Sequence, residues 1–241
     1  MSLKDHYSKL HQATGQVIDL SFAEGHAESM AKSHAYIEDL ERWLSILRSR
    51  KESVALQAAV REYQFALLAL SLGSYRSAFS ALRLFLELTF ASIRWSVNEQ
   101  ELREWLRGER DLNWKALSDA ELGILSKKVL RLYSDLFQDE APVYRSSAEA
   151  VYRECSEFIH GNAAANNALP ATIQFDPTTF SLWHDKADVT RLIVTFSLSA
   201  RYLDELSAAD KTILEHGLLD ILGHSKSVRL ILGAPVEEND G

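Results

Sequence analysis

Apolar residues recur at helical spacing along most of this chain, and few residues that end helices interrupt them. Among the 241 residues are only 10 glycines and 4 prolines. Because these two residue types mark turns and helix ends, their scarcity indicates long helices joined by few tight turns. The sequence therefore predicts an all-α fold, organised as one large domain or as one domain with appendages.

The periodicity also predicts where the helices lie. Their expected ranges are 3–15, 24–49, 52–72, 75–97, 99–107, 119–137, 142–160, 185–205 and 208–222, with one more turn as an option over 225–232. Ser118 and Glu121 have the spacing of a capping box, which predicts that a helix starts at residue 119. Residues 162–183 break the pattern, and Asp176 and Pro177 suggest a short β-hairpin insertion there.

No repeat, low-complexity tract or shift in composition marks a domain boundary. The breaks divide the chain into N-terminal helices (1–50), a helical core (51–162), and a loop with a C-terminal helical hairpin packed on the same domain (163–241). The most apolar helix is 75–97, and a helix that is apolar nearly all round is central in its fold. The residues expected in the hydrophobic core are Leu67, Leu70, Phe79, Leu82, Leu86, Phe90, Ile93, Leu130, Tyr133, Val151, Cys155 and Ile159.

The charge of the chain argues against a protein that is coated in nucleic acid, because the formal net charge is −8. The acids are concentrated toward the two ends. Residues 42–202 hold 19 acids and 20 bases, so this middle region is nearly neutral. The average charge therefore leaves room for a local basic cleft in the middle of the chain.

Cysteine content and hydropathy favour a cytoplasmic protein without a membrane segment. The one cysteine, Cys155, excludes an intrachain disulfide and fits a reducing compartment. The first twelve residues lack the apolar stretch of a secretory signal. The longest apolar runs, such as Phe65–Leu70, are too short to cross a bilayer. We therefore expect no membrane partner.

Common catalytic and cofactor motifs are absent from the sequence. It contains no Walker A loop and no GxGxxG, HExxH, GxSxG or CxxC motif. The eight histidines form no metal-ligand pattern with nearby carboxylates. The sequence therefore predicts neither a metal site nor another cofactor.

Two residues of helix 142–160 could support chemistry on a phosphate. Arg153 and His160 are seven residues apart, which places them within about 20° of one helix face. Glu149 and Glu157 flank the same stripe. A histidine can move a proton near neutral pH, and an arginine can hold the charge that develops on phosphoryl oxygens. The structural alternative is that Arg153 pairs with Glu149 or Glu157 and that His160 only caps the helix end.

A polar stripe also follows the apolar helix 75–97. Arg76, Arg83, Glu87 and Arg94 lie within about 40° of one another around the helix axis. On a central helix such a stripe must meet a cleft, a partner or a buried salt-bridge network. We consider the three arginines as an RNA-positioning face, with Glu87 and Glu157 as further residues of the cleft. The alternative is an Arg83–Glu87 ion pair between two arginines whose charged ends reach solvent.

The segment RECSEFIHG, which runs from Arg153 to residue 161, resembles the Arg-(4 to 6 residues)-His signature of HEPN domains. The earlier segment SYRSAFSALRLFLE is similar to the core helix of such domains, and the resemblance covers roughly residues 50–162. It implies a HEPN-like helical bundle that forms a homodimer, with the Arg-His helices of two protomers meeting across a cleft. It also implies a metal-independent endoribonuclease of an antiviral defence or toxin system. Arg153 would then stabilise charge, His160 would transfer protons, and the product would carry a 2′,3′-cyclic phosphate.

A second interpretation belongs to another functional class. Glu154 follows Arg153 where active members often have Asn, Asp or His, and many HEPN domains lack nuclease activity. The chain would then be a catalytically inactive scaffold or regulator that dimerises or binds a protein partner. A third interpretation is a helical domain of no HEPN kinship, in which the tryptophan-bearing segment 104–114 either binds a partner or folds back as a core anchor.

Overall fold

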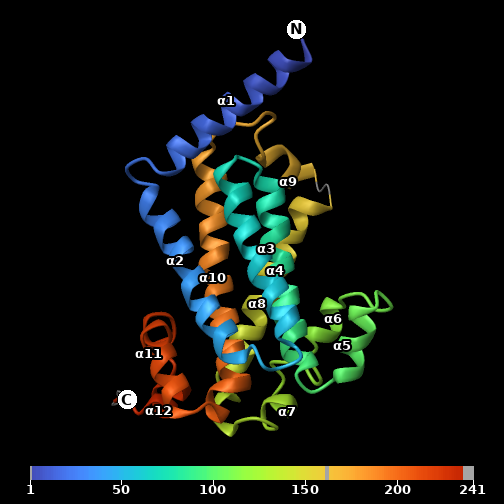
Figure 1. Ribbon diagram of the computed structural model, residues 1–241, viewed down its shortest axis with the longest axis vertical. Helices are drawn as coiled ribbons and strands as arrows, with labels where there is room; N and C mark the ends of the chain where they lie inside the picture. Colours follow the sequence, from blue (N-terminus) through green and yellow to red (C-terminus); the bar gives the residue numbers. More distant parts are fainter. Residues whose placement is uncertain (1, 161–162, 236–241) are drawn as a thin grey trace.

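A computed structural model describes residues 2–160 and 163–235 of the chain. Five long helices form an upright bundle: α2 (Ala27–Leu47), α3 (Ser53–Ser71), α4 (Tyr75–Trp95), α8 (Ala141–Ile159) and α10 (Pro177–Tyr202). Figure 1 shows α1 (Leu3–Ser21) crossing one end of this bundle. The described residues contain no strand, so the predicted all-α class is confirmed for them.

Shorter helices cover the opposite end of the bundle (Figure 1). On one side lie α5 (Glu99–Leu106) and α6 (Trp114–Leu117), and on the other lie α11 (Ala208–Leu222) and α12 (Lys226–Leu232). The remaining elements are α7 (Lys127–Leu130), α9 (Ala163–Ala168) and two short 3₁₀ helices, Asp135–Phe137 and Leu203–Glu205. The optional turn over 225–232 is thus confirmed as α12.

Helix α4 lies at the centre of the bundle, as its apolar sequence predicted. It packs against α3, α8 and α10, and nearly all of its side chains from Phe85 to Trp95 are buried. The residues predicted for the core are buried, with the exceptions of Tyr133 and Ile159, which are half-buried. A single hydrophobic core joins residues from Met30 to Val228.

The connection between α3 and α4 requires a glycine. Gly73 has a φ of +73°, in the left-handed region that other residues avoid. A Cβ atom at this position would also lie 3.2 Å from Cγ2 of Val17 on α1. Gly73 therefore permits a tight turn and lets α1 pack directly over it.

The predicted helix over 119–137 is wrong. The carboxylate of Asp119 instead accepts hydrogen bonds from the backbone N–H groups of Glu121 and Leu122. The hydroxyl of Ser118 donates to the Trp114 carbonyl, so the expected capping box does not form. Side chains that bond to the nearby backbone in this way compete with a continuous helix. The segment is therefore a series of turns that contains only α7 and one 3₁₀ helix.

The predicted β-hairpin is not observed either, because α10 starts earlier than its expected beginning at 185. Asp176 is the N-cap of α10, and its carboxylate accepts a 2.7 Å hydrogen bond from the N–H of Thr179. Pro177 occupies the first turn of the helix, where its missing N–H costs nothing. The Asp-Pro pair that suggested a turn between strands therefore starts a helix. Residues 161 and 162, within the same predicted insertion, lie outside the described part of the chain.

Two helical glycines differ in their surroundings, and this difference gives a test of the packing. Outside its own helix backbone, no described residue lies within 4 Å of a Cβ atom placed on Gly15 of α1. A Cβ atom placed on Gly217 of α11 would collide with the carboxylate of Asp39, which bonds to Arg42. We expect Gly15→Ala to stabilise the protein by about 1 kcal/mol and to raise Tm by about 2–4 °C. We expect Gly217→Ala to lower Tm in the same thermal denaturation measurement. Equal shifts of the two variants would contradict the close approach of α11 to α2.

Candidate functional site

Helix α8 presents one face to the core and the opposite face to solvent. Ala148, Val151 and Cys155 are buried. Arg153 and His160, together with Glu157 between them, are exposed. The helix therefore holds the Arg and His side chains outward on a single surface stripe, two turns apart.

The acids near Arg153 are engaged elsewhere or lie in solvent. Glu149 lies 3.9 Å from Arg145, and Glu154 forms an ion pair with Lys186 of α10. Within residues 2–160 and 163–235, Arg153 itself has no hydrogen bond or ion pair. The predicted structural alternative, an intrahelical pair of Arg153 with Glu149 or Glu157, is therefore not observed.

His160 marks the end of α8. It is the C-cap residue, and its backbone N–H donates a 3.1 Å hydrogen bond to the Ser156 carbonyl. The imidazole lies at the surface. His160 is thus the last described residue before α9, which begins at Ala163.

Two residues of the polar stripe on α4 lie inside the contact between α4 and α8. Nε of Arg83 is 3.5 Å from Oε2 of Glu87, and the guanidinium lies 4.5 Å from the centre of the Tyr152 ring. On its other side Tyr152 stacks on Trp114 at 4.2 Å. Burial, and then the charge of Glu87, raise the pKa of Tyr152 above its usual value, so its hydroxyl stays protonated. Arg83 and Glu87 thus form the internal ion pair that was the alternative for this stripe.

Arg94, two turns beyond Glu87 on α4, is also engaged within the fold. Its Nε and Nη2 atoms donate to the two carboxylate oxygens of Glu101 on α5, at 2.8 and 3.0 Å. These hydrogen bonds hold the pKa of Glu101 below its usual value and raise that of Arg94. Arg110 adds a weaker contact to Glu101 at 3.7 Å. Arg94 therefore attaches α5 to the bundle.

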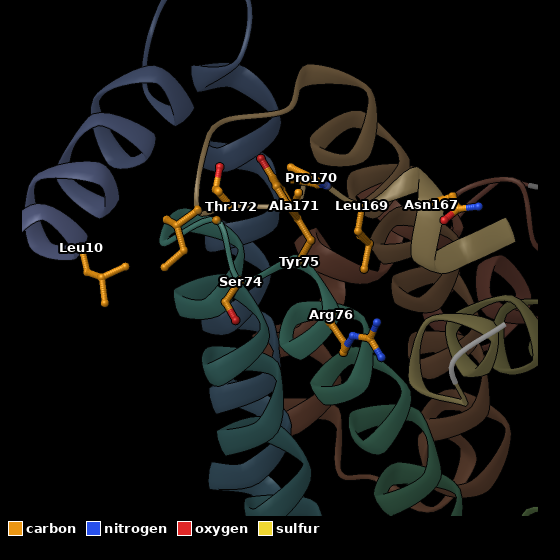
Figure 2. Close-up of a pocket in the computed structure, with 11 residues that line it drawn as sticks. Leu10, Ser74, Tyr75, Arg76, Asn167, Leu169, Pro170, Ala171 and Thr172 are labelled. Carbon is orange, nitrogen blue, oxygen red and sulfur yellow. The ribbon is translucent and has the colours of Figure 1, made fainter. Parts of the chain in front are cut away.

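Arg76 lies in a third environment, at the end of α4 near α1. It lines a cavity of about 850 Å³ between α1, the start of α4 and residues 169–173. Figure 2 shows Leu10 on one side of this cavity and Asn167 on the other. The four residues of the predicted stripe therefore lie in three different environments. Arg76 lines a cavity, Arg83 and Glu87 form an internal ion pair, and Arg94 joins α4 to α5.

The tryptophans of segment 104–114 fold back toward the bundle. Trp105 lies 4.9 Å from Trp95 between ring centres, and Trp114 contacts both Tyr152 and Phe90. These contacts support the interpretation of both tryptophans as core anchors. The ring faces that a protein partner would contact are packed against the bundle instead. The spacing of residues within segment 104–114 could not show these contacts, because the aromatic rings that the tryptophans touch lie on α4 and α8.

A site that the sequence analysis missed lies between α8 and α10. Its cavity has a volume of about 420 Å³ and is lined by residues from α8, α10 and the connection before α12. The hydroxyl of Tyr144 lies 3.0 Å from Nε2 of His224 at this cavity. Eighty positions separate the two residues in the chain, so no local motif joined them.

Comparisons of the chain with models of protein families, with curated proteins and with solved structures found no match. Among the described residues, no three His, Cys, Asp or Glu side chains are grouped as metal ligands would be. In the same part of the chain, no helix combines the length and the apolar character needed to span a membrane.

Proposed function

We propose that the protein is a metal-independent endoribonuclease of the HEPN type, possessing Arg153 and His160 as its catalytic residues. The observation that supports this proposal is the side chain of Arg153, which lies on the exposed face of α8 in line with the exposed His160 and has no partner among the described residues. A permanently charged guanidinium and an imidazole are then both accessible to a phosphodiester. The HEPN resemblance adds the type of substrate, which is RNA.

In this reaction the 2′-hydroxyl of RNA attacks the adjacent phosphorus. The imidazole of His160 takes the proton from the 2′-oxygen as the new P–O bond forms. The bond from phosphorus to the 5′-oxygen breaks, and that oxygen takes up a proton. The guanidinium of Arg153 stabilises the negative charge that builds up on the phosphoryl oxygens. The products are a 2′,3′-cyclic phosphate and a 5′-hydroxyl end, so neither oxidation nor a metal is required.

The proposal includes a second copy of the chain. Arg153 and His160 lie on the outer surface of one helix, and neither lines the 850 Å³ cavity. A surface helix alone does not exclude water or hold both sides of a phosphodiester. Two α8 faces that meet across a cleft, as the resemblance implies, would supply a second histidine to protonate the leaving oxygen.

A specific observation favours the second candidate function, an inactive HEPN-like scaffold that binds a protein partner or dimerises. Arg83 and Arg94 are bound to carboxylates inside the fold. Near Arg153 the exposed side chains include Glu149 and Glu157, which repel a polyanion. On this interpretation the free Arg153 would bind an acidic partner surface.

The nuclease proposal is tested with a labelled RNA pool in the presence of EDTA. Arg153→Ala and His160→Ala are each expected to reduce cleavage by at least about 100-fold, because each variant removes a group that acts in the transition state. Arg61→Ala and His216→Ala serve as matched controls, since both residues are exposed on other helices. Mass spectrometry of the fragments is expected to show cyclic phosphate ends.

Other results would separate the two candidate functions. Equal cleavage by the wild type and both α8 variants would place the active site elsewhere or indicate a contaminant. Absence of cleavage by a folded, dimeric wild type across the RNA pool would favour the scaffold. Circular dichroism of every variant confirms that a loss of activity is not a loss of folding.

A further inference from the structure

The cavity between α8 and α10 has the features of a small-molecule site. Its volume of about 420 Å³ lies within the range of ligand pockets in proteins. The walls are formed by the apolar side chains of Val143 on α8 and of Val189, Leu192 and Ile193 on α10. A pocket of this kind binds a compact apolar or aromatic group by removing it from water.

The walls of this cavity are held rigid by contacts behind them. The ring of Tyr144 stacks on Phe196 of α10 at 3.7 Å between ring centres, and Tyr144 is 8% exposed. Oε1 of Glu140 accepts a 3.0 Å hydrogen bond from the N–H of Ser227, which joins α12 to the start of α8. The pocket is therefore formed before a ligand arrives, which lowers the entropy cost of binding.

The polar groups of the pocket select the charge of the ligand. Burial, and then the negative charge of Glu140, raise the pKa of Tyr144 to about 12, so its hydroxyl stays neutral and can donate to His224. The carboxylate of Glu140 also lines the cavity, together with that of Asp139, whose side chain is 96% exposed, and the described lining residues include no lysine or arginine. Lys127 lies 3.5 Å from Asp139 but outside the lining. Such a lining favours a cation over a neutral group or an anion.

We propose that this cavity binds a small organic amine, in which an apolar or aromatic body is joined to a cationic head. The body lies against Val189, Leu192 and Ile193, and the head lies at the carboxylates of Asp139 and Glu140. The site is separate from Arg153 and His160 and does not depend on the nuclease proposal. It gives the protein a binding activity for a class of ligand that RNA cleavage does not use.

Three phenyl compounds that differ only in the charge of the head test the proposal. The full chain is titrated calorimetrically with phenethylamine, 2-phenylethanol and phenylacetate. We expect the amine to bind at least tenfold more tightly than the alcohol and phenylacetate to bind most weakly. Equal affinities for the amine and the alcohol, or absence of binding by all three, would overturn the proposal.

Two kinds of variant locate the binding. Val189→Phe fills the cavity from α10, and Ser147→Phe fills it from α8; each is expected to weaken amine binding at least tenfold. The double variant Asp139→Asn with Glu140→Gln keeps the shape and an acceptor for Ser227, and it is expected to bind the amine and the alcohol equally. Unchanged amine binding by a folded filling variant would place the ligand elsewhere.

The same variants test whether a second copy of the chain, and not a small molecule, occupies this cavity. If a second copy of the chain covers this cavity, Val189→Phe will weaken self-association in analytical ultracentrifugation, and the three compounds will not bind. That result would overturn the small-molecule site. Amine binding with an unchanged sedimentation profile in Val189→Phe would support it.

Discussion

Arg201→Ala is expected to lower the free energy of unfolding by about 3 kcal/mol, although the residue belongs to neither of the proposed sites. Arg201 is 6% exposed, and its Nε donates a 2.7 Å hydrogen bond to the hydroxyl of Ser96. Its guanidinium also lies 4.2 Å from the centre of the Tyr133 ring and 4.6 Å from that of Tyr202. Charged hydrogen bonds and cation–π contacts of this kind are strongest where water is excluded.

A matched control is available in the same cluster. Arg201 and Arg50 each donate a 3.1 Å hydrogen bond to Glu205, and both lie over the Tyr202 ring, but the side chain of Arg50 is 34% exposed. Because water competes for an exposed pair, Arg50→Ala is expected to cost no more than about 1 kcal/mol. Urea unfolding followed by circular dichroism measures both values. A similar midpoint for the two variants would show that burial does not set the strength of these contacts.

Acidification from pH 7 to pH 5 is expected to lower the free energy of unfolding by about 2 kcal/mol through His184. Burial is the main cause that lowers the pKa of His184 from 6.5 to about 4. The imidazole Nδ1 lies 2.8 Å from the hydroxyl of Ser33, and Nε2 is buried without a hydrogen-bond partner in the described part of the chain. In the unfolded chain the ring takes up a proton near pH 6.5, whereas the folded protein resists protonation until about pH 4. The loss of stability therefore begins below pH 6.5 and grows as the pH falls toward 4.

The measurement compares unfolding curves at several pH values for two histidine variants. His184→Gln removes the titrating group, so the slope of stability against pH between 7 and 5 is expected to decrease. His216→Gln removes an exposed histidine of α11 and is expected to keep the wild-type slope. The carboxylates with lowered pKa values, such as Glu101 and Glu104, titrate below this window. An unchanged slope for His184→Gln would show that the pH dependence arises elsewhere.

The long helices could be predicted from the sequence because each shows its buried face as a repeat of apolar residues. Helix α4 is the clearest example, since its apolar character on nearly all sides also indicated its central place. For the segment 119–137 the same pattern gave a wrong prediction. Its apolar residues have helical spacing, but local hydrogen bonds from backbone N–H groups to the carboxylate of Asp119 prevail. Asp176 shows that one residue type serves both turns and N-caps, and only the tertiary context decides between them.

The candidate sites could be predicted from the sequence only where their residues lie on one helix. Spacing within one helix was sufficient to place Arg153 and His160 on a common face. It could not show that Arg83 lies over Tyr152, because that contact depends on the register of α4 against α8. The pair of Tyr144 and His224 depends on how α8 meets the connection before α12. Contacts between distant segments of the chain follow from packing rather than from any local pattern.

The tight turn at Gly73 favours early pairing of α3 with α4 during folding. Helices α3 and α4 are consecutive and share the most extensive contact between any two helices described. Closing the short connection between them costs little chain entropy, whereas joining α8 to α4 requires closing a loop that contains the irregular segment 118–134. We therefore expect a hairpin of α3 and α4 to form early in folding, and the face that α4 offers to α8 to stay exposed until the later half of the chain docks.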